Sequence, residues 1–271
     1  MKKCGTFIFS FILATLFSCG GEKEKPQQPA ETAGEEIRIS QFELHEKHKL
    51  NLQATDSPAL TIDISLPVIT TGNSAADENI GRTIAYTLFE NNGTSVRQAG
   101  KEFASTRKEE YMELRPEYLN HKEGDMPLVW FNNSYSITGE ISIGYKEYIN
   151  YIILWDEFTG GAHPNSYYTV LNFDPATGEE VVLQDILKEN YEEPLTALLV
   201  STLASNLQVE NSDGIRSKGY LYPNADMYIS NNYILEKVQI VFIYNKYDIA
   251  PYAVGDIIIN ISYDKLKDLL K

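Results

Sequence analysis

Apolar and polar residues alternate between residues 60 and 66, and this is the first regular pattern in the chain. Every second position is apolar, which is the period of a half-buried strand. Pro67 is expected to end the strand, because proline has no N–H to donate to a neighbouring strand. Residues 37–52, which come before it, show no such period and are expected to be polar and solvated. The apolar positions of the strand are Leu60, Ile62, Ile64 and Leu66.

The apolar spacing then lengthens from two residues to four, which predicts two helices. The first should begin at Ser74, with Asp77 completing the N-cap. A second and more polar helix is expected from Ser95 to about Arg115, with Pro116 just beyond its end. The apolar stripe of the first helix consists of Ile80, Ile84 and Leu88.

Two antiparallel strands are expected in the middle of the chain. Residues 134–145 alternate between apolar and polar side chains, as in a strand with one solvated face. Residues 149–155 are apolar at nearly every position, which is typical of a central strand. A tight reversal at Tyr145–Tyr148 should join the two strands.

The second half of the chain mixes strands and helices. Residues 167–173 read as a strand, followed by a turn at Asp174–Gly178, where proline and glycine favour the required backbone angles. Residues 184–189 are expected to start a helix, and Pro194 suits the first turn of a longer one. Further along, the pattern predicts a loop at 211–224, strands at 238–244 and 257–261, and a closing helix at 263–271.

Because strands and helices are grouped rather than strictly alternating, the expected fold class is α+β. We expect two small domains, each a mostly antiparallel sheet packed with helices. The first should span residues 37–155 and the second residues 156–271. The chain of 271 residues, 43% of them hydrophobic, is long enough for two cores of this size.

The first residues have the pattern of a targeting segment. Lys2 and Lys3 precede an apolar run, residues 6–17, that is too short to span a bilayer. The sequence that ends at Cys19 resembles a bacterial lipoprotein signal, so residues 1–18 are expected to be removed and Cys19 to carry lipid such as palmitate. An ordinary secretory signal with a chance cysteine is the alternative. Residues 19–36 then form a flexible tether, which predicts a lipid-anchored protein of the cell envelope, on the periplasmic or outer face of an outer membrane.

Charge and cysteine content narrow the choice of partners. Residues 1–18 contain two of the 23 basic residues and no acidic one, so their removal changes the net charge from −15 to −17. Such a chain repels nucleic acid and favours a cationic partner. Cys4 would leave with the signal and Cys19 would be acylated, so no thiol remains for a disulfide, a metal or a nucleophile.

Several separated motifs resemble a known type of envelope domain. Residues 155–187 and 240–266 are similar to the C-terminal domain of lysozyme-sensing anti-sigma factors, a domain of unknown function that also occurs in many bacterial lipoproteins. The motifs are Thr159-Gly160-Gly161-Ala162-His163, Asn172-Phe173-Asp174 with Thr177-Gly178, Leu183 to Leu187, Tyr247 to Ala253 with Gly255, and Ile261-Ser262-Tyr263.

Residues 58–150 resemble, more loosely, the partner domain that accompanies peptidoglycan deacetylases. The strand before Pro67 and the helix after Gly72 carry this similarity. Neither the cytoplasmic and membrane-spanning parts of the sensing proteins nor the metal-binding deacetylase domain is recognised in this sequence. The resemblance therefore implies a binding or sensing module without sigma-factor control.

His163 is the first candidate site residue. The neighbouring Gly160 and Gly161 would let the backbone approach a ligand closely. His163 could contact that ligand, or act as a general base with Asp156 or Glu157. It could equally lock the turn by bonding to a backbone carbonyl.

The other candidates lie in the loop from Asn245 to Tyr252. Tyr247 and Tyr252 could stack on sugar rings or anchor a protein, or else pack over the sheet. The HEKH sequence at 45–48 lacks the i, i+4 histidine spacing of a zinc-protease helix. Phosphate-binding glycine motifs are also absent, so neither a metal nor a cofactor is expected.

These observations favour a non-catalytic envelope lipoprotein that binds or senses a protein or a cell-wall glycan, with lysozyme as a candidate ligand. The alternative is an envelope hydrolase, or an accessory to peptidoglycan processing, that uses His163 and a nearby carboxylate. The geometry around residues 156–166 distinguishes these hypotheses.

Overall fold

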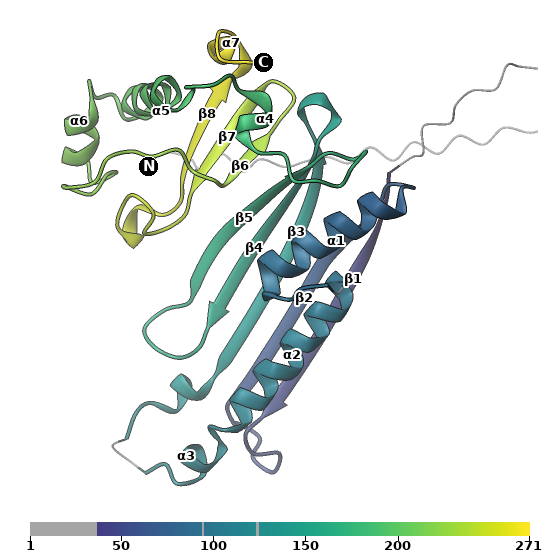
Figure 1. Cartoon of the computed structure of the whole chain (residues 1–271). Coiled ribbons are helices and arrows are strands. Elements are labelled where there is room, and N and C mark those ends of the chain that lie inside the picture. The colour runs from purple at the N-terminus through teal and green to yellow at the C-terminus, as the bar shows by residue number, and fades with distance from the viewer. Residues whose placement is uncertain (1–36, 94, 123–124) are drawn as a thin grey trace, which may run out of the picture. The chain divides into compact units, whose positions relative to one another are not determined.

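The computed structural model describes residues 37–93, 95–122 and 125–271, which form an α+β fold with two sheets (Figure 1). One sheet has five strands in sequence order, and the other has three. The five strands are β1 (Arg38–Lys49), β2 (Ala59–Thr70), β3 (Asn133–Ile143), β4 (Ile149–Phe158) and β5 (Asn165–Phe173). The three are β6 (Tyr233–Leu235), β7 (Gln239–Tyr244) and β8 (Ile257–Ser262). The predicted α+β class is confirmed.

The described helices are α1 (Ser74–Phe89), α2 (Val96–Met112), α3 (Arg115–Leu119), α4 (Leu183–Ile186), α5 (Glu192–Leu207), α6 (Ser212–Ser217) and α7 (Tyr263–Leu266). Short 3₁₀ turns are η1 (Leu128–Phe131), η2 (Tyr145–Glu147) and η3 (Tyr252–Val254). The predicted helices near 74, 95 and 194 are confirmed. α4 is shorter than expected, α6 forms within the predicted loop, and the closing helix ends at Leu266.

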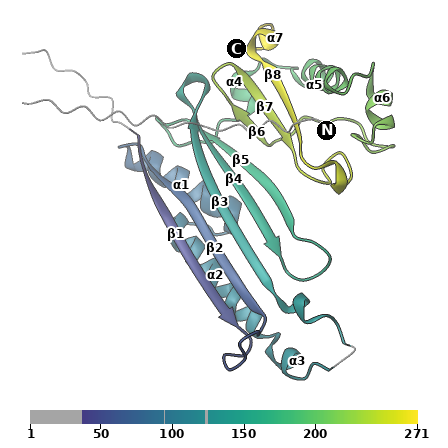
Figure 2. The same ribbon diagram turned by 180° about the vertical axis from the view of Figure 1, so that it is seen from behind.

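Five of the six described strand pairs are antiparallel, whereas β2 and β3 pair in parallel. Parallel neighbours need a long crossover connection, which here contains α1 and α2. Figures 1 and 2 show both helices on the same face of β1 and β2. Alternate residues of β2 and β4 point toward these helices and form the first core, which includes Ile62, Ile64, Tyr151 and Ile153.

A second core lies between the three-stranded sheet and α5. α5 is entered through Pro194, as predicted, and its stripe packs against β8. The buried residues of this stripe are Leu195, Leu199 and Leu203. The opposite face of β7 contributes Val241 and Ile243, which pack with Val170 of β5 in a smaller cluster. β7 is therefore buried on both faces.

Asparagine side chains join β4 and β5 to the three-stranded sheet. The Asn150 amide, fully buried, donates to the carbonyl of Leu235 at 3.2 Å and accepts from its N–H at 2.9 Å. Asn232 makes the same kind of pair with β5, accepting from the Val170 N–H and donating to the Tyr168 carbonyl. A primary amide carries the donor and acceptor of a peptide group, so these side chains bridge strands that do not pair directly. We call this set, Asn150, Asn172, Asn232 and Asn245, the asparagine seam.

Gly144 leaves room for the contact between Asn150 and Leu235. A Cβ at this position would lie 1.6 Å from the carbonyl oxygen of Leu235, closer than any side chain can approach. The backbone of β6 therefore reaches Asn150 only because residue 144 has no side chain. Gly144 also accepts from Glu147 in the η2 reversal between β3 and β4, which lies where the sequence predicts a tight turn.

The predicted turn at 174–178 contacts the start of α1. Asn73 and Asn79 donate from their side-chain amides to the carbonyls of Ala176 and Thr177. Gly178 has φ +69°, and a Cβ there would lie 2.1 Å from the Ala76 carbonyl oxygen. The turn is therefore a packing element as well as a reversal.

Three local expectations for residues 37–77 were wrong. Residues 38–49 form the edge strand β1, in which Phe42 is the one buried side chain, so they carry little apolar period. β2 continues through Pro67, because its pairing with β3 ends at Ser65 and Pro67 needs no donor there. The N-cap of α1 is Asn73 rather than Ser74.

Pro116 and residue 155 mark the expected ends of the second helix and of the first domain. Pro116 lies beyond the end of α2, as predicted, and it also occupies the first turn of the short helix α3. The limit expected between residues 155 and 156 falls inside β4, and the five-stranded sheet continues through β5. The assignment of two separate domains stays a prediction.

Replacing Asn150 with alanine is expected to destabilise the protein by about 2–4 kcal/mol, because the buried N–H and C=O of Leu235 lose their partner. Urea unfolding monitored by circular dichroism measures this change. Asn260→Ala, at an exposed position of β8, is the matched control and should change stability by less than about 0.5 kcal/mol. Equal effects of the two substitutions would contradict the role of the seam.

Candidate functional site

Three of the predicted site residues come together between two loops. His163 lies in the loop that joins β4 to β5, and Tyr247 and Tyr252 lie in the connection from β7 to β8. The rings of His163 and Tyr252 stack with centroids 4.4 Å apart and an interplanar angle of 24°. The Tyr247 ring lies 5.5 Å from that of Tyr252. We call these three rings the aromatic cluster.

The carbonyl of Pro164 holds the first two rings in place. Nδ1 of His163 donates to this oxygen at 3.0 Å, which assigns the proton to Nδ1 because a carbonyl can only accept. The hydroxyl of Tyr252 donates to the same oxygen at 3.5 Å. His163 is exposed and Tyr252 half-buried, so the stack has an open side. One backbone oxygen thus ties the two loops together.

Tyr247 has an unusual backbone conformation. Its φ is +73°, in the left-handed region that costs a residue with a side chain about 1–2 kcal/mol. Tyr247 is 53% exposed, so burial of its ring does not offset this cost. The conformation follows from a tight turn between Asn245 and Asp248. The Asp248 carboxylate accepts from the backbone N–H of Asn245 at 2.7 Å, and the backbone N–H of Asp248 donates to the carbonyl of Asn245 at 3.0 Å. The turn therefore projects the Tyr247 ring outward.

Asn245 anchors this turn to the other sheet. Its side-chain oxygen accepts from the N–H of Tyr168 at 2.7 Å, and its amide donates to the carbonyl of the same residue at 2.9 Å. The last member of the asparagine seam thus lies directly before the aromatic cluster. Burial raises the pKa of the neighbouring Asp248 carboxyl above its ordinary value, although the N–H of Asn245 opposes the shift.

Lys246 lies beside the Tyr252 ring. Its Nζ lies 5.9 Å from the centroid of the Tyr252 ring and 3.8 Å from a carboxylate oxygen of Asp256. It also donates to the hydroxyl and the carbonyl of Ser166. The ammonium group is therefore held by β5 and the loop before β8, and it places positive charge near the ring.

Gly160 and Gly161 serve the loop itself. Their φ angles are +91° and +102°, which only glycine adopts readily. A Cβ at Gly160 would lie 2.8 Å from the Trp130 carbonyl oxygen, whereas one at Gly161 would meet nothing within 4 Å. Both glycines shape the hairpin end that carries His163, and a role in ligand contact stays a prediction.

No carboxylate orients His163 within the described residues. Glu157 accepts from the indole N–H of Trp155 at 3.2 Å, and Asp156 pairs with Ser166 across β4 and β5. The hydrogen bond of the imidazole goes to Pro164. The arrangement is therefore suited to holding a ring for contact, and it lacks the base-and-orienter pair of a hydrolase.

The HEKH sequence lies on β1 and holds its histidines apart. His45 faces Asp63, with Nδ1 2.8 Å from Oδ1, while His48 lies 2.6 Å from Glu46. An odd separation along a strand places the two imidazoles on opposite faces. Within residues 37–93, 95–122 and 125–271, no group of three or more His, Cys, Asp or Glu side chains could hold a metal. Cys19, the predicted lipid attachment, lies outside the described residues.

Lys246 and Asn245 are the site residues that sequence reasoning missed. Both lie in the loop between β7 and β8, of which only Tyr247 and Tyr252 were predicted as site residues. An asparagine directly after the apolar run of β7 was the available signal, because asparagine is depleted in strands and favoured where a side chain replaces a backbone partner.

Comparison with known protein families finds a match for one segment in the second half of the chain. Residues 184–264 match the family described as "Protein of unknown function (DUF3298)". This segment of the chain is similar to DUF3298 proteins. The matched residues run from α4 to α7 and include Tyr247 and Tyr252 but not His163. The context of anti-sigma factors and deacetylases stays an expectation.

Solved structures extend the similarity to most of the chain. A member of the DUF3298 family from Bacteroides fragilis has a TM-score of 0.76 and 28% identity, over 88% of this chain and 95% of that chain. A DUF3298 family protein from Pseudomonas aeruginosa has a TM-score of 0.56 and 16% identity, over 86% and 95%, which shows the fold alone. No curated protein matches the chain. In the part of the chain that the structure describes, no helix is long and apolar enough to cross a membrane.

Replacing Asp63 with asparagine is expected to lower the pKa of His45. The hydrogen bond from the imidazole to the Asp63 carboxylate is the main cause of its raised pKa, and the charge of Glu43 adds to it. A raised histidine pKa means that the contact stabilises the fold below the ordinary pKa and that this contribution is lost as the pH rises through the raised value. NMR titration of the His45 ring measures the shift. Asp56→Asn, at an exposed position away from His45, is the control and should not change the titration midpoint of His45. An unchanged His45 midpoint in Asp63→Asn would contradict the assigned cause of the shift.

Proposed function

We propose that this chain is a non-catalytic cell-envelope lipoprotein that binds a cell-wall glycan through the aromatic cluster. The observation that supports this proposal is the exposed His163–Tyr252 stack, with the Tyr247 ring projecting beside it. Sugar rings present apolar C–H faces that pack on aromatic rings, and hydroxyl groups that find polar partners at the edge. Lys246 and the backbone of the loops supply such partners.

The cluster is also held rigidly enough to bind. The Pro164 carbonyl joins the two ring-bearing loops, and the Asn245 amide fixes the turn before Tyr247. A ligand that meets rings already in place loses less freedom on binding than one that must order them. The strained φ of Tyr247 fits a residue that is held outward for contact rather than for packing.

The structure favours this proposal over a hydrolase. A histidine base needs a partner that sets its tautomer and stabilises its charged form, and that partner is usually a carboxylate. Here the partner of His163 is the neutral carbonyl of Pro164. The envelope location and the lipid on Cys19 are part of the proposal and rest on the sequence pattern.

Tyr252→Ala is expected to weaken binding of an N-acetylglucosamine tetramer by up to about tenfold, because one ring contact is worth about 0.5–1.5 kcal/mol. Tyr252→Phe keeps the ring and should bind like the parent chain. Isothermal titration calorimetry measures the affinities, and circular dichroism confirms that each variant is folded.

Tyr86→Ala is the matched control, because Tyr86 is an exposed tyrosine on α1, 55% exposed and outside the cluster. It should leave glycan binding unchanged. The glycan proposal fails if the parent chain does not bind the tetramer, or if the two alanine variants bind equally well.

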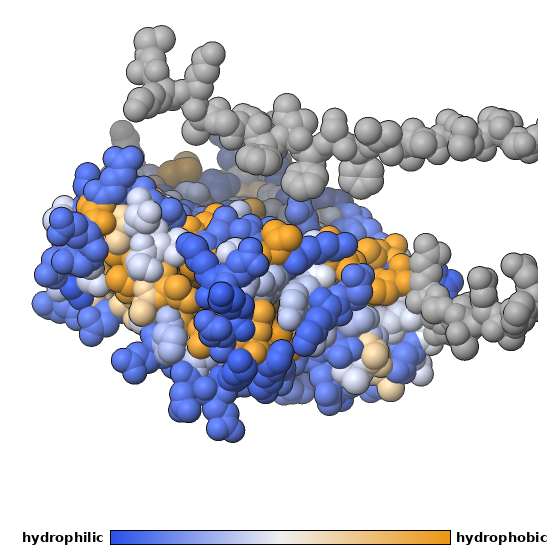
Figure 3. Space-filling model, turned by 90° about the horizontal axis from the view of Figure 1, so that it is seen from above, coloured by the Kyte–Doolittle hydropathy of each residue, from blue (hydrophilic) through white to orange (hydrophobic). Residues whose placement is uncertain are grey.

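A cationic protein such as lysozyme is the second candidate, and the excess of acidic residues favours it. Acidic groups lie beside the cluster, where Asp248 is exposed and Asp256 is paired with Lys246. Polar and charged residues also cover most of the face seen in Figure 3, with apolar residues in separate groups. The net charge of −15 attracts cationic proteins over distances set by the salt concentration.

Lysozyme is expected to bind at about 0.02 M salt and to lose most of that affinity at about 0.5 M, where the Debye length falls well below 10 Å. Titration of the purified chain at both salt concentrations checks this. An acidic protein of similar size serves as the control and should not bind at either concentration. Absence of lysozyme binding at low salt would remove lysozyme as a ligand.

A further inference from the structure

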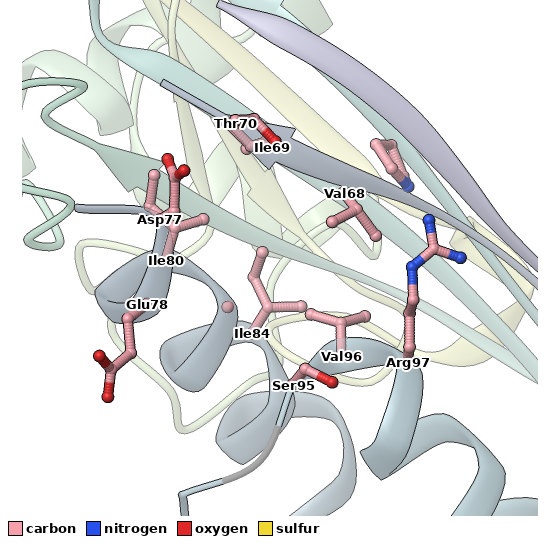
Figure 4. A pocket seen from close by; sticks show the side chains of 12 residues that line it. Val68, Ile69, Thr70, Asp77, Glu78, Ile80, Ile84, Ser95, Val96 and Arg97 are labelled. Carbon is pink, nitrogen blue, oxygen red and sulfur yellow. The ribbon is translucent and has the colours of Figure 1, made fainter. Parts of the chain in front are cut away.

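A cavity separate from the aromatic cluster lies between β2, α1 and the start of α2. Its volume is about 380 Å³, within the range of about 300–1,000 Å³ that is usual for ligand pockets. Figure 4 shows Val68, Ile84 and Val96 pointing into it from three different elements. We call this cavity the α1 pocket. Its apolar lining consists of Pro67, Val68, Ile69, Ile80, Ile84 and Val96.

Gly81 lines the pocket from the middle of α1 without a structural reason to be glycine. A Cβ there would meet nothing within 4 Å, and Gly81 is not among the residues with positive φ. Glycine inside a helix is less stable than alanine, because it loses more backbone freedom on folding. Other described glycines are explained by a close contact, as Gly100 is by the Phe42 ring, or by a positive φ, as Gly161 is. At Gly81 the missing side chain has a different effect, since it keeps the wall of the pocket open.

Arg97 supplies a positive charge at one end of the pocket. Its Nη2 donates to the Ser40 hydroxyl and to the Gln41 carbonyl, both at 3.2 Å. These acceptors are neutral, and within the described residues Arg97 forms no ion pair, although the chain carries 38 acidic residues. An arginine that lacks a carboxylate partner can bind an anionic group.

The two carboxylates that line the pocket are placed differently. Asp77 accepts from the N–H and the hydroxyl of Thr71, at 2.6 and 2.8 Å, so its charge is already engaged. The Glu78 side chain points away from the apolar lining in Figure 4. The end of the pocket near Asp77 and Glu78 carries carboxylates, whereas the other end carries the Arg97 guanidinium and suits an anion.

We propose that the α1 pocket binds an anion with a single aliphatic chain, of the fatty-acid class. The chain would occupy the space between Val68, Ile84 and Val96, and the carboxylate would bind Arg97. The open wall at Gly81 makes room for the methylene groups. This site does not depend on the aromatic cluster.

Calorimetric titration with tetradecanoate, below its micelle concentration and without detergent, tests the proposal. The full chain carrying Cys19→Ser is used, so that no acyl group of its own competes. One equivalent should bind, and tetradecyltrimethylammonium, with an equal chain and the opposite charge, should bind at least about tenfold more weakly, as expected for loss of a charge-assisted contact. No binding of tetradecanoate, or equal binding of the two compounds, would overturn the proposal.

Three further substitutions locate the ligand. Gly81→Leu should fill the pocket and abolish binding, whereas Gly81→Ala should raise the melting temperature and only weaken binding. Arg97→Gln should weaken tetradecanoate binding about tenfold and leave tetradecanol unaffected. Val68→Phe fills the same space from β2, and it is used in place of Gly81→Leu if the melting temperature of Gly81→Leu is too low for the titration. If Gly81→Leu or Val68→Phe is folded and still binds tetradecanoate like the parent chain, the ligand lies elsewhere and the proposal is overturned. Tyr252→Ala, outside the pocket, should bind tetradecanoate like the parent chain.

Discussion

The fold depends on side-chain amides that complete hydrogen bonding between two sheets. β5 ends the five-stranded sheet, and its outer backbone groups would lack partners without Asn232 and Asn245. Asn150 does the same for Leu235 from the interior of β4. Buried peptide groups need partners, and an amide side chain can supply both a donor and an acceptor where two strands are not aligned to pair. Between β5 and β7, the small apolar cluster that includes Val170 and Val241 provides the rest of the packing.

The aromatic cluster is a consequence of this joint. His163 belongs to the hairpin of one sheet, whereas Tyr247 and Tyr252 follow a strand of the other. Their rings meet because Asn245, directly after β7, binds the backbone of Tyr168 in the first half of β5. A change in the seam would therefore alter the site without touching any of its rings. The α1 pocket lies within a different core and does not share this dependence.

Regular apolar periods predicted the elements that bury one clear face. The alternation at 60–66 identified β2, and the four-residue spacing identified α1. β1 escaped prediction because Phe42 is its single buried side chain, and the strand is held by pairing along its length. Local pattern also could not show that Pro67 sits just past the last β2–β3 pair, where Gly139 leaves room for its ring.

The candidate site was predicted in its members but not in its arrangement. His163 and Tyr252 are far apart in sequence, and their stacking depends on tertiary contacts that no local period encodes. Asparagines within apolar strands, such as Asn150 and Asn172, were the visible trace of those contacts. They interrupt runs in which a polar side chain is expected only if it has a buried partner.

The outer edge of β1 has a consequence for crowded surfaces. Within the described residues no strand pairs with that edge, and open strand edges can recruit other chains into a shared sheet. β1 carries charged side chains of both signs along its length, among them Glu43, Lys47 and Lys49. A neighbouring copy that tried to extend the sheet would have to dehydrate these groups. Copies of this chain that lie close together would therefore remain separate molecules.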